Sequence, residues 1–394
     1  MKLGETVRLV RGRTYKSSLL SDVEGPVLLG LGSIEKNGGF KTGTRARYPG
    51  ESDESILLHP GDLYVSLKDL TQSCDLLGAV SRVPSSITEG RLTQDTVKLV
   101  FSDDEDEAIK LYVYWSLRTP QYRRYCKAHG TGTTNMSLSR KDFLNWSIPE
   151  RTYARDVLIS LLEMLEKKAD VITQLNGYLE ELASVLYKKF VASADGRMGT
   201  LADLVELQKD GARAGKHPEL PYMPIDVMPM KHFGVTEFKA NEEAKSSLQL
   251  FRRDDIVIGA MRVYFHRVVL APCEGITRNT CFVLRPRSSS LREYALLTCF
   301  QPEAIEYANV RSKGSTMPYA VWENSFETYP VLIPEEGQLD RFSRQLAPLI
   351  DQIRDSCREN NRLASLRDAL LPKLMSGEID VSEIDLTQLN SHLA

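Results

Sequence analysis

The sequence predicts an α+β protein in which two mixed α/β domains in tandem are separated by a pair of long antiparallel coiled-coil helices with pseudo-two-fold symmetry. Three observations lead to this prediction. The chain repeats itself at a constant offset, each copy ends in a long helix with a heptad pattern, and short β-branched runs occupy the segments before the helices. A length of 394 residues also favours more than one domain.

The repeat is clearest where each copy passes into its long helix. The segment IPERTYARDVLISLL, from Ile148, aligns without a gap with IPEEGQLDRFSRQLA, from Ile333, at an offset of 185 residues (333 minus 148). The preceding segments match as well, since EGRLTQDTVKLV, from Glu89, resembles EGITRNTCFVLR, from Glu274. Each copy is therefore a globular segment followed by a helix.

Short β-branched and aromatic runs such as DLYVSL, DTVKLVF and DIVIGAM, bounded by Gly, Pro, Asp and Asn, predict strands in the globular segments. Helical patterns such as IKLYVYWSLRTPQYRRYC lie between them, so both segments are expected to be mixed α and β. The expected organisation is a first domain over 1–149, a central helix over 150–192, a second domain over 193–334, a C-terminal helix over 335–376 and a tail over 377–394.

The first long helix has apolar residues at alternating spacings of three and four, the pattern of a coiled-coil seam that continues through Leu179, Leu182 and Leu186. A second seam follows the C-terminal helix. Each helix spans about 41 residues, or roughly 60 Å. The alternative is that each helix packs only on its own domain. The residues expected to pair the helices or to dock partner subunits are Leu158, Leu161, Leu165, Ile172, Leu175, Leu346, Ile350, Ile353, Leu363, Leu370, Leu371 and Leu374.

Motifs for catalysis, metal binding or nucleotide binding are missing from the sequence. The cysteines form no CxxC pair, the histidines form no HxH or HExxH, and no P-loop, GxGxxG or GxSxG segment occurs. We therefore expect a binding and scaffolding protein, not an enzyme, with no metal or cofactor on this chain. No apolar run approaches the roughly 18 residues of a membrane span, and the start lacks a secretory signal, so we expect a cytoplasmic protein that does not enter a membrane.

Positive charge is concentrated in the second copy. Between 256 and 292 there are six arginines, at 262, 267, 278, 285, 287 and 292, against one acid, Glu274. Such a run is either a solvated face or a surface for nucleic acid. The polar loops GTGTTN (Gly130–Asn135) and KGSTMPY (Lys313–Tyr319) occupy equivalent places in the two copies. They are candidate contact loops, and the alternative is that each is a tight turn that caps the next element.

The segment LLPKLMSGEI, from Leu370, is the most specific feature of the chain. Together with the IPE starts, the GTT and GST loops and the duplication, it closely resembles the specificity (S) subunit of type I restriction-modification systems over essentially the whole chain. The resemblance implies that each domain is a target recognition domain that reads one half of a split double-stranded DNA sequence. It also implies that methyltransferase (M) subunits dock on the paired helices and that the restriction (R) subunit joins through that assembly. S-adenosylmethionine, ATP and Mg are then expected on the partner subunits.

Cations of both domains and the polar loops are the DNA-binding candidates, because Lys and Arg contact phosphates while polar side chains read base edges. A coiled-coil protein-protein adaptor without sequence-specific DNA binding is the alternative function, although an adaptor has no need for the arginine-rich stretch. We also expect that truncation after Asp368 leaves both domains folded but weakens methyltransferase recruitment. The DNA-binding candidates are Lys36, Lys41, Arg45, Arg47, Lys68, Arg82, Thr133, Thr134, Asn135, Arg262, His266, Arg267, Arg278, Asn279, Lys313, Ser315 and Thr316.

Overall fold

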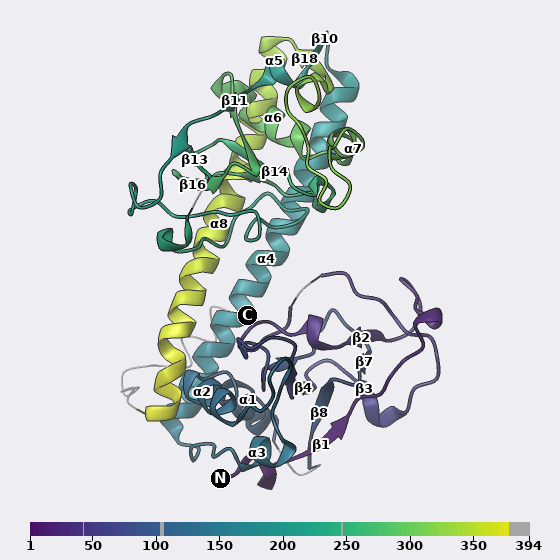
Figure 1. Cartoon of the computed structure of the whole chain (residues 1–394), viewed down its shortest axis with the longest axis vertical. Helices are drawn as coiled ribbons and strands as arrows, with labels where there is room; N and C mark the ends of the chain where they lie inside the picture. The colour runs from purple at the N-terminus through teal and green to yellow at the C-terminus, as the bar shows by residue number, and fades with distance from the viewer. Residues whose placement is uncertain (42, 103–105, 246, 378–394) are drawn as a thin grey trace. The chain divides into compact units, whose positions relative to one another are not determined.

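The chain is described by a computed structural model (Figure 1). Of the expected tail over 377–394, only Gly377 lies within the described residues. No helix in the described part of the chain is long and apolar enough to cross a membrane. The described residues are 1–41, 43–102, 106–245 and 247–377.

The chain divides into two compact units. Unit 1 consists of Met1–Leu165 together with the chain from Leu366 onward, and unit 2 is Glu166–Ser365. The two long helices, α4 (Tyr153–Ser193) and α8 (Glu336–Ser376), each comprise 41 residues. Each of them contributes one stretch to each unit, so neither unit is assembled from a globular segment alone.

In unit 1 the largest sheet has the strand order β1-β8-β4-β6 with antiparallel neighbours. All residues of β4 are buried, which explains why its sequence LYVS does not alternate between apolar and polar side chains. A sheet β2-β7-β3 and the pair β5-β9 complete the strands that the structure describes here. The elements are β1 (Val7–Arg11), β2 (Val27–Leu29), β3 (Leu57–Leu58), β4 (Leu63–Ser66), β5 (Lys68–Asp69), β6 (Val80–Arg82), β7 (Gly90–Leu92), β8 (Thr96–Phe101), α1 (Glu107–Ser116), α2 (Pro120–His129), β9 (Met136–Ser137) and α3 (Arg140–Asn145).

In unit 2 the largest sheet has the order β11-β17-β14-β15, again antiparallel, and the central strand β14 is fully buried. A sheet β12-β13-β16 and the pair β10-β18 accompany it. The elements are β10 (Gly196–Thr200), α5 (Leu201–Leu204), β11 (Val205–Gln208), β12 (Gly211–Ala212), β13 (Leu248–Phe251), β14 (Ile256–Gly259), β15 (Val268–Leu270), β16 (Gly275–Arg278), β17 (Cys281–Pro286), α6 (Arg292–Cys299), α7 (Pro302–Val310) and β18 (Pro330–Pro334).

The two large sheets have the same topology. Strands β1, β8, β4 and β6 of unit 1 correspond in order to β11, β17, β14 and β15 of unit 2. The predicted strands DLYVSL, DTVKLVF and DIVIGAM are found as β4, β8 and β14, and the aligned EGRL and EGIT segments form β7 and β16. The repeat seen in the sequence is therefore a repeat of sheet topology as well.

The short helices of unit 1 begin where the sequence supplies capping groups. The side chains of Asp106, Thr119 and Ser139 accept hydrogen bonds from backbone N–H groups at the starts of α1, α2 and α3. In α2 the next residue is Pro120, whose fixed φ suits the first helical position. These helices cover the core of unit 1 through Trp115, Tyr122 and other fully buried side chains.

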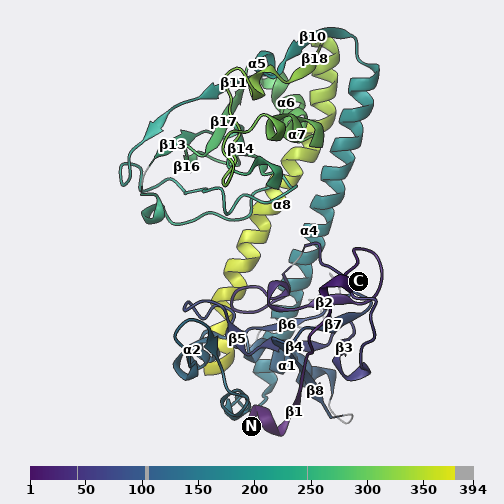
Figure 2. The same ribbon diagram turned by 45° about the vertical axis from the view of Figure 1, so that its right-hand side comes forward.

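Within unit 2, α4 and α8 lie side by side and run antiparallel (Figure 1, Figure 2). Successive contacts use residues of rising number on α4 and falling number on α8. The contacts, in order along α4, are the ion pair Lys168–Glu359 (2.5 Å), the hydrogen bond from Asn176 Nδ2 to Cys357 Sγ (3.6 Å) and the stacked rings of Phe190 and Phe342 (centroids 4.3 Å apart).

Within unit 1, the first turns of α4 meet the last turns of α8, also antiparallel. The Arg155 guanidinium donates to the carbonyl oxygens of Leu374 (2.9 Å) and Met375 (3.2 Å), which satisfies carbonyls that have no partner inside the helix. Leu158 of α4 lies in the same apolar core as Leu371 and Leu374. In both units, then, α4 and α8 contact each other and the globular segment.

The buried face of α4 differs from the expected seam in its second half. Leu158, Leu165 and Ile172 are buried as expected, and Leu161 is partly buried, but Leu175 and Leu182 are 43% and 45% exposed. Asn176 and Ala183 are buried in their place. The seam is displaced by one residue because small Ala183 allows close approach to the globular core, whereas the sequence pattern favoured the larger leucines. On α8, Leu346, Ile350 and Ile353 are buried, while Leu363 and Leu370 are partly buried.

The C-terminal end of α8 belongs to the core of unit 1. Leu371 and Leu374 are almost completely buried, and the Gln121 side chain of α2 donates to the Pro372 carbonyl oxygen at 3.2 Å. Truncation after Asp368 would remove these core residues, so we now expect it to destabilise unit 1. Removing these leucines uncovers apolar surface that contributes roughly 1.5–3 kcal/mol per side chain.

Candidate functional site

Each unit carries, at the same place in its fold, a surface built from a strand connection and a polar loop. In unit 1 it consists of 67–79, which joins β4 to β6, and 130–138, and we call it tip 1. In unit 2 it consists of 260–267, which joins β14 to β15, and 313–320, and we call it tip 2. The sequence-predicted polar loops thus lie beside connections between corresponding strands.

The pairing of loop and connection is the same in both tips. In tip 1 the Leu138 N–H donates to the Leu67 carbonyl (2.9 Å), and in tip 2 the Ala320 N–H donates to the Ala260 carbonyl (2.8 Å). An antiparallel bridge closes each polar loop, between Thr131 and Ser137 in tip 1 and between Lys313 and Tyr319 in tip 2. The equivalence that the sequence repeat predicted for these loops therefore holds at the level of individual hydrogen bonds.

Polar contacts hold tip 1 together. The Lys68 ammonium pairs with Asp95 at 2.9 Å, and the Gln72 amide donates to the Thr133 carbonyl oxygen at 2.5 Å. Burial works to raise the pKa of Asp69, but hydrogen bonds from Leu76 and Thr71 hold it below its ordinary value. Lys68 lies opposite Ser137 at the end of the polar loop, whose residues Thr133, Thr134 and Asn135 are exposed.

Backbone geometry holds tip 2 together. Arg262 (φ +50°) and His266 (φ +52°) lie in the left-handed region on either side of the short turn Val263–Phe265. The Arg262 N–H donates to the Pro318 carbonyl (2.7 Å), and the His266 ring donates through Nε2 to the Phe300 carbonyl (3.0 Å).

Burial of the His266 ring lowers its pKa, so this candidate serves as an internal anchor. The other tip 2 candidates, Arg262, Lys313, Ser315 and Thr316, lie at the surface or partly exposed.

Several candidate cations of unit 1 are engaged in contacts with other residues of the protein. Arg82 forms two hydrogen bonds to the Glu163 carboxylate on α4 (2.8 and 2.9 Å), so it fastens the sheet to the helix. Arg45 lies over the Phe40 ring, Arg47 donates to the Gly25 carbonyl, and Lys36 pairs with Asp75 at 3.3 Å. Lys41 is exposed.

The arginine-rich stretch of unit 2 is less positive in space than in sequence. Arg285 forms a two-pronged ion pair with Asp255 (both contacts 2.8 Å), and Arg287 donates to the Ala202 carbonyl. Arg267 donates to two backbone carbonyls, of Ile225 and Met228. The neutralising acids were missed because they lie just outside the counted window or on another element.

Arg262 and Arg278 are the exceptions in that stretch. Within the described residues, neither guanidinium has a hydrogen bond or ion pair, and Arg278 is exposed next to Asn279. Positive charge without an acidic partner in this part of unit 2 thus lies on the turn between β16 and β17 and on tip 2, and also on the exposed Arg287, whose guanidinium donates to a backbone carbonyl.

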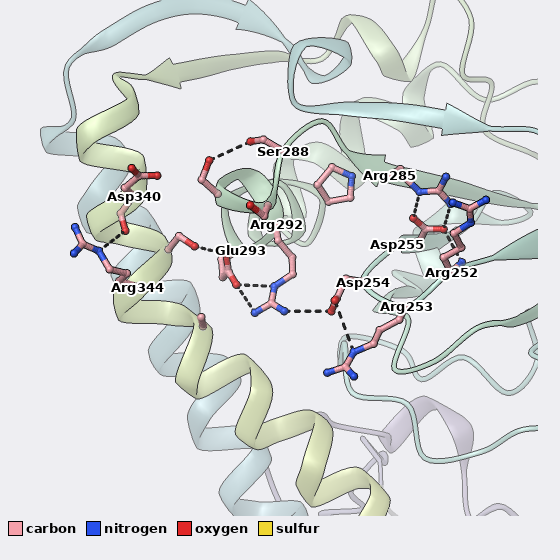
Figure 3. A pocket seen from close by; sticks show the side chains of 15 residues that line it. Arg252, Arg253, Asp254, Asp255, Arg285, Ser288, Arg292, Glu293, Asp340 and Arg344 are labelled. Carbon is pink, nitrogen blue, oxygen red and sulfur yellow. Dashed lines mark hydrogen bonds and ion pairs between the residues drawn. The ribbon is translucent and has the colours of Figure 1, made fainter.

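A basin of about 800 Å³ opens between the sheet of unit 2 and α8 (Figure 3). Arg292 at its floor contacts Glu293 (2.5 Å) and Asp254 (3.2 Å), and Glu293 also accepts from Ser343 of α8 (2.7 Å). Arg354 of α8 pairs with the same Asp254 at 3.2 Å. The positive and negative side chains that line the basin pair with each other. These ion pairs attach the globular segment of unit 2 to α8, as the Arg82–Glu163 pair attaches the sheet of unit 1 to α4.

Two aromatic residues of tip 2 were missed as candidates. Tyr264 and Phe265 are 46% and 38% exposed, and their ring centroids lie 4.9 Å apart. The sequence signal for them was the motif RVYFHR, in which adjacent aromatic residues lie between cations. It was overlooked because such a run also matches the pattern of a buried strand.

The chain is similar in sequence to the type I restriction enzyme MjaIX specificity subunit of Methanocaldococcus jannaschii, with 36% identity over 316 residues, 71% of each chain. It is 26% identical to the HindI specificity subunit of Haemophilus influenzae over 87 residues, 22% of this chain and 19% of that one. No protein-family model matches. Among solved structures, the S subunit of a type I restriction-modification system from M. genitalium has a TM-score of 0.57 with 15% identity, covering 95% of both chains, and therefore shares the fold.

Proposed function

This chain belongs to the specificity subunits of type I restriction enzymes, and on that premise we propose that it reads a bipartite, gapped double-stranded DNA target, one half with each tip, without catalysing a reaction itself. The observation that carries the proposal is the duplication of one surface. Tip 1 and tip 2 have corresponding hydrogen bonds on corresponding strands, yet they present different side chains. Such a pair of surfaces suits a target whose halves differ in sequence.

A protein that reads DNA with two domains requires a fixed distance between them, because half-sites on DNA recur at positions set by the helical repeat. We propose that α4 and α8, paired as a coiled coil, hold the two recognition domains at the distance that corresponds to the gap. The contacts of both helices within each unit support this role.

The side chains of the tips suit the two kinds of DNA contact. Arg262 and Lys313 in tip 2 and Lys68 in tip 1 are placed to neutralise phosphates, which sets the register of the protein on the duplex. Thr133, Asn135 and Thr316 carry donors and acceptors for base edges in the major groove. His266, Arg267 and Arg82 are removed from the contact set that we propose, because they support the fold.

The partner enzyme requires its own surface, and we propose that methyltransferase subunits dock on an exposed apolar row of α4. The row, which we call the α4 stripe, has spacings of four and three, so it continues a heptad pattern on a face that unit 2 does not cover. A solvent-facing row of this kind is typical of a surface for another helix. Its residues, each 43% to 68% exposed, are Val171, Leu175, Tyr178, Leu182 and Val185.

In this scheme the restriction subunit joins through the methyltransferase subunits, in the cytoplasm. The methyltransferase brings S-adenosylmethionine, and the restriction subunit brings ATP and Mg. Nothing in the proposed role of this chain requires a cofactor of its own.

The test of target reading is a map of methylated adenines. We expect that a host without adenine methylation, given this chain and its methyltransferase partner, acquires methylation at one gapped motif with two defined halves. The matched control expresses the methyltransferase with an unrelated specificity subunit. Methylation without sequence preference, or at a motif that does not depend on this chain, would favour the adaptor function.

The test of docking is substitution on the stripe. Leu175→Asp with Leu182→Asp should abolish co-purification with the methyltransferase while the chain stays folded, because both side chains are exposed. Leu366→Asp, at an exposed apolar position on α8, is the control. Undiminished co-purification of the double variant would place the docking surface elsewhere.

A further inference from the structure

We propose that tip 2 is a wedge that inserts Tyr264 and Phe265 between neighbouring base pairs of its DNA half-site and unstacks them, whereas tip 1 reads its half without unstacking. This inference rests on the proposed function, since it assigns a mode of contact to a tip that binds DNA. It distinguishes the two halves of the target by their deformation as well as by their sequence.

The exposure of the two rings is the first observation. Together with Tyr319 and Met317 of the adjoining loop, which are about half exposed, they make up the exposed large apolar side chains of tip 2, which we call the apolar projection. The loop and the turn are joined by the bridge between Met261 and Tyr319. Leaving large apolar side chains in water gains nothing for the free protein, so the projection is explained by a partner that covers it.

The rigidity of the turn is the second observation. Two residues with positive φ bracket it, and such strained positions persist only where surrounding contacts hold them. Val263 between them is buried, Arg262 is held by Pro318, and the His266 carbonyl accepts from the Lys231 N–H at 2.8 Å. The rings are therefore presented on an anchored turn, which lowers the entropy lost when they are inserted.

The surrounding charge is the third observation and identifies the partner as a duplex. Arg262 precedes the two rings, and Lys313 lies across the bridge to Tyr319. Neither cation has an ion pair within the described residues. Apolar wedges flanked by cations unstack base steps in DNA, with the cations on the neighbouring phosphates. A purely apolar protein groove would leave both charges without counterions.

Tip 1 supplies the internal comparison. Its connection presents Thr71, Gln72 and Ser73, and these are engaged in local hydrogen bonds, Thr71 with Asp69 and Ser73, Gln72 with the Thr133 carbonyl. No aromatic side chain lies between residues 67 and 79 of the sequence. Apart from Leu70, which is 64% exposed, the connection presents polar side chains at its surface in one copy, whereas it presents two aromatic rings in the other.

The experiment uses the full chain assembled with its methyltransferase subunits and duplexes that carry its mapped target. The fluorescent adenine analogue 2-aminopurine, whose emission rises when it is unstacked, is placed at successive positions of each half-site, away from the methylated adenines. We expect emission to rise on binding at one step in one half only. The double variant Tyr264→Ala, Phe265→Ala should lose this rise but keep target-specific binding, weakened about 5- to 150-fold, as expected for the loss of aromatic stacking on bases.

Tyr153→Ala, which removes another exposed tyrosine that belongs to neither tip, is the control and should leave the signal unchanged. An emission rise that persists in the double variant, or specific binding by the wild-type complex without any rise, overturns the wedge. Loss of methyltransferase co-purification in the double variant also overturns it, because the projection would then contact a protein. Absence of target-specific binding by the wild-type complex contradicts the proposed function itself.

Discussion

Tip 1 and tip 2 occupy the same position in two copies of one fold, but they are held together by different means. In tip 1, side chains make the local contacts, as when Gln72 donates to the Thr133 carbonyl. In tip 2, backbone groups around two residues in the left-handed region make local contacts together with the His266 ring, while the side chains of Arg262 and Lys313 have no hydrogen bond or ion pair within the described residues. The large sheets of the two units have the same strand order, so the repeat keeps the fold while its surface residues change. Two surfaces with different side chains can thus be built on one fold.

The cores of the two units differ in a second way. Unit 2 is one continuous stretch of chain, whereas unit 1 is completed by the last turns of α8. Leu371 and Leu374 arrive in its core from more than 200 residues beyond Leu158 and Leu162, with which they pack. The stability of unit 1 therefore depends on both ends of the chain.

The largest expected effect tests this dependence. Leu371→Ala with Leu374→Ala should cost about 2–5 kcal/mol per site in the free energy of unfolding of unit 1, because both leave cavities in a closed core. Amide hydrogen exchange should rise across the sheet of unit 1 and stay unchanged in the sheet of unit 2. Leu366→Ala, at an exposed position, is the control. Equal protection of unit 1 in the double variant would show that its core closes without the C-terminal turns.

The next largest loss of stability is expected at the ion pairs that attach each globular segment to a long helix. Glu293→Ala in unit 2 should cost about 3–5 kcal/mol, since it leaves Arg292 with a weaker set of acids in a buried place. Glu163→Ala in unit 1 should cost about 1–3 kcal/mol, because Arg82 and Glu163 are each about a quarter exposed and water can partly solvate the arginine that is left behind. Urea unfolding followed by exchange in each unit measures both. A larger loss of unfolding free energy for Glu163→Ala than for Glu293→Ala would contradict this order.

Single cations of the tips should act on one half of the target each. Arg262→Ala should weaken binding by about 1 kcal/mol and reduce the salt dependence by roughly one phosphate contact. Lys68→Ala should do less, because Asp95 already neutralises part of its charge. Methylation maps of the two variants, made at two salt concentrations, provide the measurement. Changes in both half-sites after one substitution would contradict independent reading by the two tips.

The smallest effect concerns pH and is confined to unit 2. The Glu180 carboxylate accepts a hydrogen bond from the His232 ring (2.6 Å) and raises the pKa of His232 above its ordinary 6.5. The stabilisation of unit 2 by the His232–Glu180 pair is therefore complete below pH 6.5. It is lost as the pH rises through the pKa that His232 has in the folded protein.

Because the His232 ring is more than half exposed, solvent screening limits the effect to less than about 1 kcal/mol. Exchange of the Phe233 amide, which donates to Glu180 at 2.9 Å, should rise over this pH range, and His232→Asn should remove the dependence. The repeat places Ser365, on α8, at the position of Glu180, so the second copy has no equivalent carboxylate and no such change is expected from it.

Sequence patterns predicted the helices and central strands because these depend on local periodicity and on runs of apolar residues. The position of the α4 seam was missed by one residue after Ile172, since only packing decides between large Leu175 and Asn176 as the inward residue. The partner of Leu371 and Leu374 was left open for a similar reason. A pattern shows that an apolar helix end needs a cover, but not which segment provides it.

The site was less predictable than the fold. Counting arginines between 256 and 292 identified a positive stretch but missed its neutralisation by Asp254, Asp255 and Glu293, which the strand order brings close. His266 resembled a surface cation in sequence and lies inside because its left-handed backbone turns the ring toward Phe300. The exposed position of loop residues such as Thr316 was predictable, since the repeat aligned their loop with one in the other copy, and their contact with DNA stays a prediction.

The completion of unit 1 by the end of α8 has a consequence for the synthesis of the protein. A ribosome releases the residues of unit 2 before it has added Leu374, so the unit that begins first is the last to possess all of its core. At about 5–20 residues per second, the nascent first segment waits roughly 10–40 s with apolar surface uncovered while the ribosome translates the rest of the chain. During this interval it is exposed to aggregation and is a natural client for chaperones, whereas unit 2 can fold as soon as it emerges.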